Sequence, residues 1–462
     1  MIAKKNKSRA RVKVGRRAFI TWAAGTTAAA VLDTCAPARA RSAPVQPMAT
    51  TAPKPTVAQA APRAKAVVEF WFDLSGAQAK HVEGIAAKFN KEFPHIEVRT
   101  SVVPTADMPT KLATALAAGS PPDTCYIGAP SLMANVIDAG RVEPLDKFRP
   151  DIATLDWLEP IKKLLIRDGH MYGIPVNCGV LGLYYNADLY KASGLDPDKP
   201  PTTWDELLSN AKAIAKPDKA IWGHYFPTKP VSITADRFWL SYLWQAGGEW
   251  LSPDESEVAF NSAAGVEALQ FYADMVQKHK VTPMKAIDNL SMGTDFETGN
   301  IGHMTLYAIW VVRAKTMKFP VRTAKLPRYK VEAAGMGAGS QPIFKDAKRK
   351  EEAWVFLDWL MKPVNAIEWV KGLGNLPTRL SLWEEPAWKQ VVRENPLIEP
   401  FVEGLRKGKL EYIGPGALEI AKQVAVGIEA AVFGKKLAKQ ALDDAAKEAN
   451  EILKRERAKA RR

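Results

Sequence analysis

Three strand patterns separated by two helical patterns open the folded part of the chain. Residues 67–72 read VVEFWF, an apolar run rich in β-formers, and apolar residues recur at helical spacing over 77–92. A second strand pattern at 94–98, a helix at 108–118 and a third strand at 122–127 follow. Strands that alternate with helices in this way predict a parallel sheet with helices on both faces. The predicted fold class is therefore α/β.

Ligands of such sheets bind outside the carboxyl ends of the parallel strands. The first strand ends at Phe72 and is followed by Asp73 and Ser75. The third strand ends near Tyr126, and the loop after it reaches Ser131. These residues are the first candidate ligand contacts.

The rest of the chain continues this alternation without a fixed-period repeat. A length of 462 residues fits two or three domains. Thr203 is expected to cap a helix, with Glu206 in the capping-box position. An amphipathic helix is expected over 435–457, with Leu437 and Ala441 on its apolar side.

The first forty residues have the pattern of an export signal. Eight Lys or Arg precede position 18, and the stretch from Ala18 to Leu32 is uncharged, apolar and too short to span a bilayer. Arg16 and Arg17, with an apolar Phe two positions later, resemble the twin-arginine export signal. The alternative is a chance arginine pair in a basic segment.

Two processing outcomes compete after this stretch. The run LDTC at 32–35 resembles a lipobox in which Cys35 carries a lipid, although its two central residues depart from the usual small ones. The alternative is cleavage after an Ala-x-Ala site, before Arg41. Residues 41–65 are rich in Pro, Ala and Thr and are expected to form a disordered linker. A tether is useful when one end is held at a membrane, which favours the lipid anchor.

The net charge of +14 is concentrated at the two ends of the chain. Residues 1–40 hold nine basic residues and one acid, and the last thirty hold ten basic residues and five acids. This distribution fits a targeting segment and a solvated tail, and it argues against a nucleic-acid-binding face. The spacing of Cys35, Cys125 and Cys178 matches neither a disulfide framework nor a metal site, so no metal and no cofactor is expected. An export context permits a bond between Cys125 and Cys178, and this pairing is left open.

A series of segments occurs in the order found in a known family. They are FWFDLSG (70–76), FNKEFPHIEV (89–98), KLATALAAGSPPD (111–123), MYGIPVNCGVLGLYYNADLY (171–190), PPTTWDELLSNAKAI (200–214), FETGNIGHMTLYAIW (296–310), EEAWVFLDWLMKP (351–363) and GNLPTR (374–379). In these segments the chain resembles the extracellular solute-binding proteins of ABC importers, in the group that includes the maltose-binding protein. The resemblance runs from about Val67 to the C-terminus.

The resemblance implies two α/β lobes, each a mainly parallel sheet flanked by helices, with a hinge and a ligand cleft between them. Each lobe is then built from separate segments, with the first lobe at 66–143 and 332–368 and the second at 147–328 and 373–462. It also implies a protein without enzymatic activity that works outside the cytoplasmic membrane. Such a protein closes on a small solute, in this group a sugar, and delivers it to the permease subunits of the importer. We expect a monomer.

The resemblance adds candidate ligand contacts from the second lobe. Trp310 lies where the family often places a sugar-stacking aromatic, and a core role is the alternative. Positions similar to Asp236, Arg237 and Trp239 touch ligand in the maltose binder. Charged side chains of this kind fix the orientation of sugar hydroxyls. If the ligand were a glycerol phosphate, Arg237 or Arg379 could bind its phosphate group.

Other classes of function find less support in the sequence. A glycosidase needs two carboxylates on opposite sides of the scissile bond, and no segment singles out such a pair. No nucleophile elbow or metal-ligand set is found either. A sensory binding protein that presents its ligand to a receptor has the same sequence features as a transport component. The ligand itself is left open among oligosaccharides, monosaccharides and glycerol phosphates.

Overall fold

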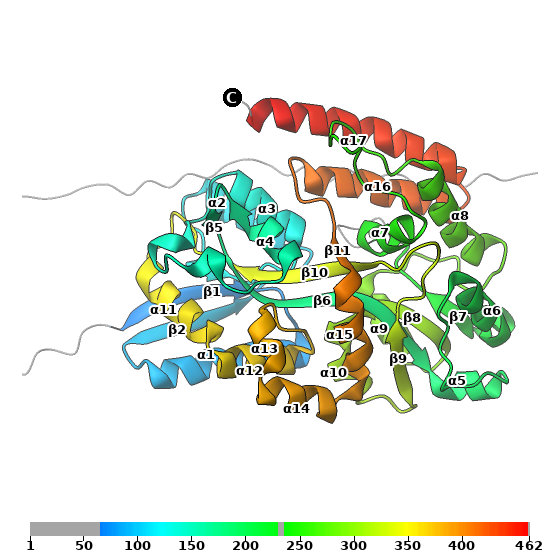
Figure 1. Cartoon of the computed structure of the whole chain (residues 1–462), viewed down its shortest axis with the longest axis horizontal. Coiled ribbons are helices and arrows are strands. Elements are labelled where there is room, and N and C mark those ends of the chain that lie inside the picture. The colour runs from blue at the N-terminus through cyan, green and yellow to red at the C-terminus, as the bar shows by residue number, and fades with distance from the viewer. Residues whose placement is uncertain (1–64, 230–234, 461–462) are drawn as a thin grey trace, which may run out of the picture. The chain divides into compact units, whose positions relative to one another are not determined.

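The computed structural model describes residues 65–229 and 235–460 (Figure 1). The predicted export signal with Arg16 and Arg17, the predicted lipidation site Cys35 and the linker up to residue 64 lie outside the described residues. Within the described residues the chain forms two lobes, and the strands β6 (Ile174–Asn186) and β10 (Ala334–Gln341) run between them (Figure 1).

The first lobe forms around the predicted alternation of strands and helices. β1 (Ala66–Phe72) pairs in parallel with β2 (Ile96–Val102) on one side and with β3 (Thr124–Cys125) on the other. The helices between these strands are α1 (Gly76–Glu92) and α2 (Met108–Ala117). The apolar residues of α1 recur at helical spacing, so that one face of the helix is buried. The predicted parallel unit is confirmed.

Later parts of the chain complete the first lobe. α3 packs against α4, and the chain returns after β10 to place α11 against β1 and α12 against α1. The other elements of this lobe are α3 (Pro130–Asp138), η1 (Leu145–Lys147), η2 (Ile152–Thr154), α4 (Glu159–Leu165), β4 (Ile166–Arg167), β5 (His170–Met171), α11 (Lys350–Met361), α12 (Pro363–Leu373), α13 (Leu380–Glu384) and α14 (Pro386–Glu394).

β6 belongs to both lobes. All 13 of its residues are buried. Its first half pairs with β10, and its second half lies between β8 and β9 of the second lobe. β6 and β10 are antiparallel because the chain leaves the first lobe on one and returns on the other.

The second lobe contains a mixed sheet. Its strand order is β11-β10-β6-β8-β7, with β9 also paired to β6. Pairing is parallel for β7 with β8 and for β10 with β11, and antiparallel wherever β6 takes part. The two-lobed α/β fold is thus as predicted, whereas mainly parallel pairing is found in the first lobe only.

Helices surround this mixed sheet. α16 and α17, the last two helices of the chain, pack against each other at the top of Figure 1. The elements of the second lobe are α5 (Ala187–Ala192), α6 (Trp204–Ile214), η3 (Pro217–Lys219), β7 (Trp222–Tyr225), α7 (Ala235–Gln245), α8 (Ala263–Gln277), α9 (Asn289–Phe296), β8 (Ile301–Tyr307), η4 (Ala308–Trp310), α10 (Val311–Ala314), β9 (Val321–Lys325), η5 (Pro396–Ile398), α15 (Glu399–Gly404), η6 (Leu405–Lys407), β11 (Gly408–Leu410), α16 (Ala417–Val432) and α17 (Ala438–Ala460).

The packing differs from two of the predicted lobe boundaries. Residues 145–175 follow the predicted end of the first lobe, yet they pack within it, since α4 packs against α3. Residues 380–394 also stay with this lobe, since α14 packs against α12 and α13. The first crossing therefore lies inside β6. A strand shared by two sheets keeps one unbroken apolar pattern, so the sequence carries no mark at that point.

The predicted helix signals have the expected geometry. The Thr203 hydroxyl accepts a hydrogen bond from the backbone N of Glu206 at 3.2 Å, and the Glu206 carboxylate accepts one from the backbone N of Thr203 at 3.3 Å. This reciprocal pair is the predicted capping box. α17 begins only at Ala438, so Leu437 is 77% exposed, while Ala441 is buried as predicted.

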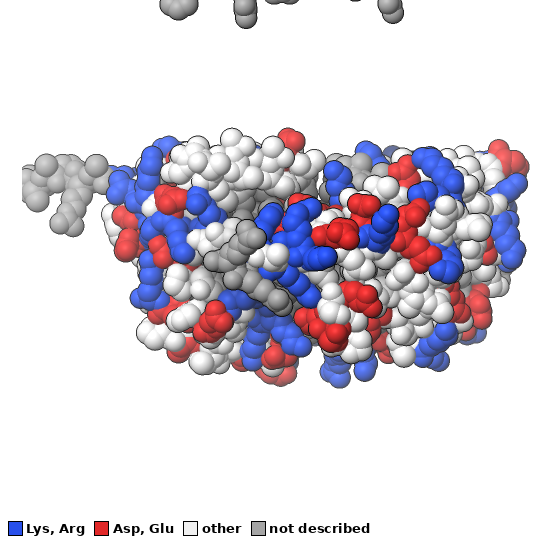
Figure 2. All heavy atoms as spheres, turned by 90° about the horizontal axis from the view of Figure 1, so that it is seen from above, with Lys and Arg blue, Asp and Glu red and all other residues white. Residues whose placement is uncertain are grey.

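Charges of both signs are mixed on the face of the molecule that Figure 2 shows. Lys and Arg side chains lie among Asp and Glu side chains there. This mixture fits the near-neutral body expected from the sequence and gives no support to a nucleic-acid-binding face. Among the described residues, no helix combines the length and the apolar character that crossing a membrane requires.

Candidate functional site

A cleft of about 240 Å³ lies where the strand ends of the first lobe face the second lobe. Its lining comes from both lobes, from both crossing strands and from the segment after α12. The lining residues are Asp73, Leu74, Thr105, Tyr126, Gly128, Ala129, Asn177, Gly179, Arg237, Tyr307, Ile309, Gly337, Ala338, Gly339 and Asn375. A ligand in this cleft would contact both lobes at once.

Asp73 follows β1 and lies in the cleft as predicted from the strand order. Burial raises the pKa of its carboxyl to about 6, although a backbone hydrogen bond and the charge of Arg237 act in the opposite direction. The hydroxyl of Thr105 donates to the backbone carbonyl of Asp73 at 3.0 Å, which holds the turn after the strand. At neutral pH the Asp73 carboxylate can accept hydrogen bonds from ligand hydroxyls.

Tyr126 forms one wall of the cleft, where its ring lies over β10. A Cβ atom added at Gly339 would come within 2.7 Å of Tyr126 Cζ, so only glycine leaves room for the ring. Asn177 Nδ2 donates to the Tyr126 hydroxyl at 3.3 Å, and Trp369 Nε1 donates to Asn177 Oδ1 at 3.2 Å. Burial, and then the charge of Asp73, raise the pKa of Tyr126 well above its usual value. Its hydroxyl therefore stays protonated and oriented.

Arg237 reaches the cleft from α7 in the second lobe. Its side chain is largely buried, and its Nε donates to the Glu411 carboxylate. The other oxygen of Glu411 accepts a hydrogen bond from the backbone N of Ser131 at 3.1 Å. Tyr307 lines the same side, with its ring edge-on to Phe238 at 5.6 Å between centroids.

Three of the predicted contact residues lie in apolar cores instead of the cleft. Phe72 is fully buried beside Phe70, because residues two positions apart on a strand point to the same face. Trp239 is fully buried in the core of the second lobe. Trp310 is 5% exposed, and its ring packs against Tyr184 at 5.4 Å between centroids. The surroundings of Trp310 fit the alternative stated in the sequence analysis, a role in core packing.

The remaining predicted contacts have separate places. Ser75 is exposed at the N-cap of α1 and is not part of the cleft lining. Ser131 is buried in the first turn of α3, where its backbone meets Glu411. Asp236 lies in the first turn of α7, and its side chain is outside the described part of the structure.

Sequence reasoning missed several polar residues of the site. Asn177 and Asn375 lie in segments that are otherwise mostly apolar, and a lone amide in such a segment is a usable signal of a polar site. Tyr307 closes a buried strand in the same way that Phe72 does, yet it faces the cleft. Glu411 gives no local signal, since its importance depends on partners 174 and 280 residues away.

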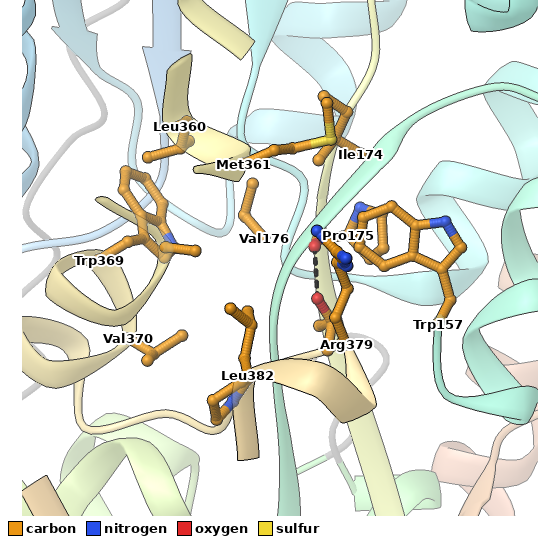
Figure 3. A pocket seen from close by; sticks show the side chains of 13 residues that line it. Trp157, Ile174, Pro175, Val176, Leu360, Met361, Trp369, Val370, Arg379 and Leu382 are labelled. Carbon is orange, nitrogen blue, oxygen red and sulfur yellow. Dashed lines mark hydrogen bonds between the residues drawn. The ribbon is translucent and has the colours of Figure 1, made fainter. Parts of the chain in front are cut away.

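A second cavity lies inside the first lobe and differs in character from the cleft (Figure 3). Its volume of about 20 Å³ has room for about one water molecule, far less than a sugar needs. Arg379 lies at its edge, bonded to Asp156 at 2.8 Å and placed over the ring of Trp157. Arg379 is therefore held away from the cleft and does not offer a phosphate contact there.

The two described cysteines are buried and free. Burial raises the pKa of the Cys125 and Cys178 thiols well above their usual value, so neither is a reactive thiolate. No disulfide joins them in the described structure. Within residues 65–229 and 235–460, no group of three His, Cys, Asp or Glu side chains could hold a metal ion.

Comparison with known proteins gives the family. Residues 76–367 match the model of the bacterial extracellular solute-binding proteins. The sn-glycerol-3-phosphate-binding periplasmic protein of Pectobacterium atrosepticum is 24% identical over 430 residues, which cover 84% of this chain and 91% of that protein.

Solved structures share this fold. An ABC transporter solute-binding protein of Thermotoga lettingae bound to α-D-tagatose superimposes with a TM-score of 0.77 at 22% identity, over 84% of this chain and all of that one (100%). The cyclic α-maltosyl-1,6-maltose binding protein of Arthrobacter globiformis gives a TM-score of 0.73 at 27% identity, over 85% of this chain and 100% of that one.

These matches confirm the fold and the family expected from the sequence. The family consists of non-enzymatic proteins that work outside the cytoplasm, bind a small ligand and serve an ABC transporter. The family model covers well over half of the chain. The chain therefore belongs to the bacterial extracellular solute-binding proteins.

Proposed function

We propose that this protein captures a small polyhydroxylated solute, a carbohydrate or a related polyol, by closing its two lobes around it. It then delivers the solute to the permease of an ABC importer. The observation that carries this proposal is the cleft in which polar groups from both lobes converge. Asp73 and Tyr126 come from one lobe, and Arg237 and Tyr307 from the other.

The composition of the cleft supports a ligand rich in hydroxyl groups. Carboxylate, guanidinium, amide and phenol groups line it together, and each can bond a hydroxyl as donor or acceptor. The two tyrosine rings and Ile309 supply apolar surface for the C–H faces of such a ligand. The ligands named for the relatives, α-D-tagatose, cyclic α-maltosyl-1,6-maltose and sn-glycerol 3-phosphate, are all polyhydroxylated.

The route out of the cytoplasm is part of the proposal. Export by the twin-arginine route is supported by Arg16 and Arg17, which directly precede an uncharged apolar stretch. Anchoring through a lipid on Cys35 is supported by the Pro-, Ala- and Thr-rich segment after it. A mature N-terminus at Arg41 in the exported protein would contradict the lipid anchor.

A thermal-shift screen of the exported protein against sugars, polyols and polyol phosphates tests the ligand class. A true ligand raises the free energy of unfolding by about 3 kcal/mol at roughly a hundredfold excess over its dissociation constant. Small-angle scattering with and without that ligand tests closure, since only a ligand that contacts both lobes favours the closed state. A ligand that binds tightly without any compaction would contradict the capture mechanism.

A further inference from the structure

Glu411 lies directly behind the cleft, at a point where the two lobes meet. Glu411 and Arg237 are each 7% exposed, and Ser131 is 1% exposed. One carboxylate oxygen accepts a hydrogen bond from the backbone N of Ser131 at 3.1 Å, and the other pairs with Nε of Arg237. The carboxylate thus has one partner in each lobe, and both bonds are shielded from water.

The two partners of Glu411 are groups that attract anions. Ser131 is the second residue of α3, a helix of nine residues, and the backbone N–H groups at a helix start carry partial positive charge. Its hydroxyl is buried without a hydrogen-bond partner among the described residues, which leaves a further donor at the same helix end. Arg237 adds a full positive charge on the cleft wall. Figure 1 shows how α3 and the segment between β11 and α16 come together at this point.

The described charges of the cleft favour an uncharged ligand. Asp73 and Arg237 are the charged residues among the described lining, and Glu411 adds a second carboxylate behind Arg237. Two carboxylates therefore face one guanidinium. Because the ion pair between Arg237 and Glu411 is buried, its charges interact in a medium of low dielectric constant and are weakly screened by salt. An anionic ligand would meet an arginine that is already neutralised and a carboxylate that repels it.

We propose that Glu411 determines the charge selectivity of the cleft: as a built-in carboxylate, it occupies the anion-attracting groups, so that the cleft takes uncharged polyols and rejects phosphorylated or carboxylated ones. This inference rests on the proposed capture of a polyhydroxylated solute. It goes further by assigning the choice between neutral and anionic members of that class to one residue outside the cleft lining.

Inorganic phosphate is the direct probe of this assignment. In titration calorimetry at neutral pH, Glu411→Gln is expected to bind phosphate at least roughly tenfold more tightly than the unaltered protein, because Arg237 and the start of α3 are released. The double variant Arg237→Gln with Glu411→Gln should lose this gain. Glu249→Gln is the matched control: it removes the same charge from an exposed residue that pairs with Lys409, and it should leave phosphate binding unchanged.

A folded Glu411→Gln variant that binds phosphate no better than Glu249→Gln would overturn the proposal.

Matched ligand pairs give a test that needs no variant: glucose with glucose 6-phosphate, and glycerol with glycerol 3-phosphate. The unaltered protein should prefer the neutral member of any pair that binds, by roughly tenfold or more. A preference for the phosphorylated member overturns the charge assignment but leaves capture of a polyol intact. If no polyol binds at all, the proposed function fails, and the phosphate titration still decides the role of Glu411.

Discussion

Aromatic residues around the cleft divide into those that face it and those that support it from the core. Tyr126 and Tyr307 line the cleft, whereas Trp310 is enclosed by Tyr184 and by Phe296 at 5.6 Å between ring centroids. The close approach of Gly293 to the indole nitrogen leaves little free space around the Trp310 ring. We therefore expect Trp310 to contribute to the stability of the fold and not to ligand binding.

Trp310→Ala should lower the free energy of unfolding by about 3–5 kcal/mol, because it leaves a cavity in a packed core. Urea denaturation of the variant measures this loss. Ligand affinity of the folded fraction should stay within a few-fold of the unaltered protein. Trp71→Ala is a useful comparison, since Trp71 is only half-buried and its loss should cost less. A large loss of affinity with normal stability would return Trp310 to the ligand site.

Gly339→Ala should lower the free energy of unfolding by about 1–3 kcal/mol, the usual cost of forcing a methyl group into a filled space, and it should also weaken ligand binding. The added Cβ would press on the Tyr126 ring and move it from its place on the cleft wall. Gly84→Ala is the control, because Gly84 lies on the exposed face of α1 outside the cleft lining, where an added Cβ would meet no atom within 4 Å. Calorimetric titration of both variants decides the matter, and equal effects would contradict this role for Gly339.

At the scale of elements, β7 and β8 enclose two buried histidines. His303 on β8 contacts the carbonyl O of Gly223 at 2.7 Å and the hydroxyl of Tyr190 at 2.6 Å. Burial lowers the pKa of His303 to about 4, and it lowers the pKa of His224 well below the usual value. Both rings are therefore neutral in the folded protein, and protonation requires that the sheet open.

The second lobe should lose stability as the pH falls from about 6.5 to about 4. The unfolded chain binds protons on these histidines near pH 6.5 while the folded chain does not, so acid favours unfolding. For His303 alone the loss amounts to about 3 kcal/mol over this interval. Urea denaturation at several pH values measures it, and His303→Asn should flatten the profile. His95→Asn, at an exposed residue, is the control. A pH profile of His303→Asn that matches the unaltered protein would refute this assignment.

The elements that the sequence predicts well are those whose signals are local. The alternation from β1 to β3, the Thr203 capping box and the apolar face of α17 all depend on residues close in sequence. The lobe boundaries are harder, because β6 serves two sheets and keeps one continuous apolar pattern. The end of the first strand predicts that Asp73 lies near the ligand, and it does line the cleft. It predicts the same for Phe72, which is buried in the core. Only the direction of each side chain distinguishes the two residues.

The site follows the same division between local and distant signals. Asp73 and Tyr126 follow from the rule that ligands meet the ends of parallel strands. Arg237 was reached through the family resemblance, as was Trp310, which lies in the core. Glu411 could not be found in this way, because its partners come from two other segments that meet only in the folded chain.

At the scale of the whole molecule, export precedes any capture of solute. Replacing Arg16 and Arg17 by lysine should block export, because the twin-arginine pattern depends on both guanidinium groups. Immunoblots of the cytoplasmic and exported fractions measure this outcome. Replacing Arg9 and Arg11 by lysine is the matched control, since these residues precede the pattern, and it should leave export unchanged. Normal export of the Arg16 and Arg17 variant would point to the general secretory route.

The chain leaves the first lobe on β6 and returns to it on β10. This order of segments affects how the protein folds during synthesis. β1 is synthesised early, yet α11, which packs against it, follows more than 250 residues later. A nascent chain emerging from the ribosome therefore carries an incomplete first lobe until almost its whole length has appeared. Fragments that stop before α14 should expose apolar surface of the first lobe and aggregate, so the first lobe is not available as a smaller independent module.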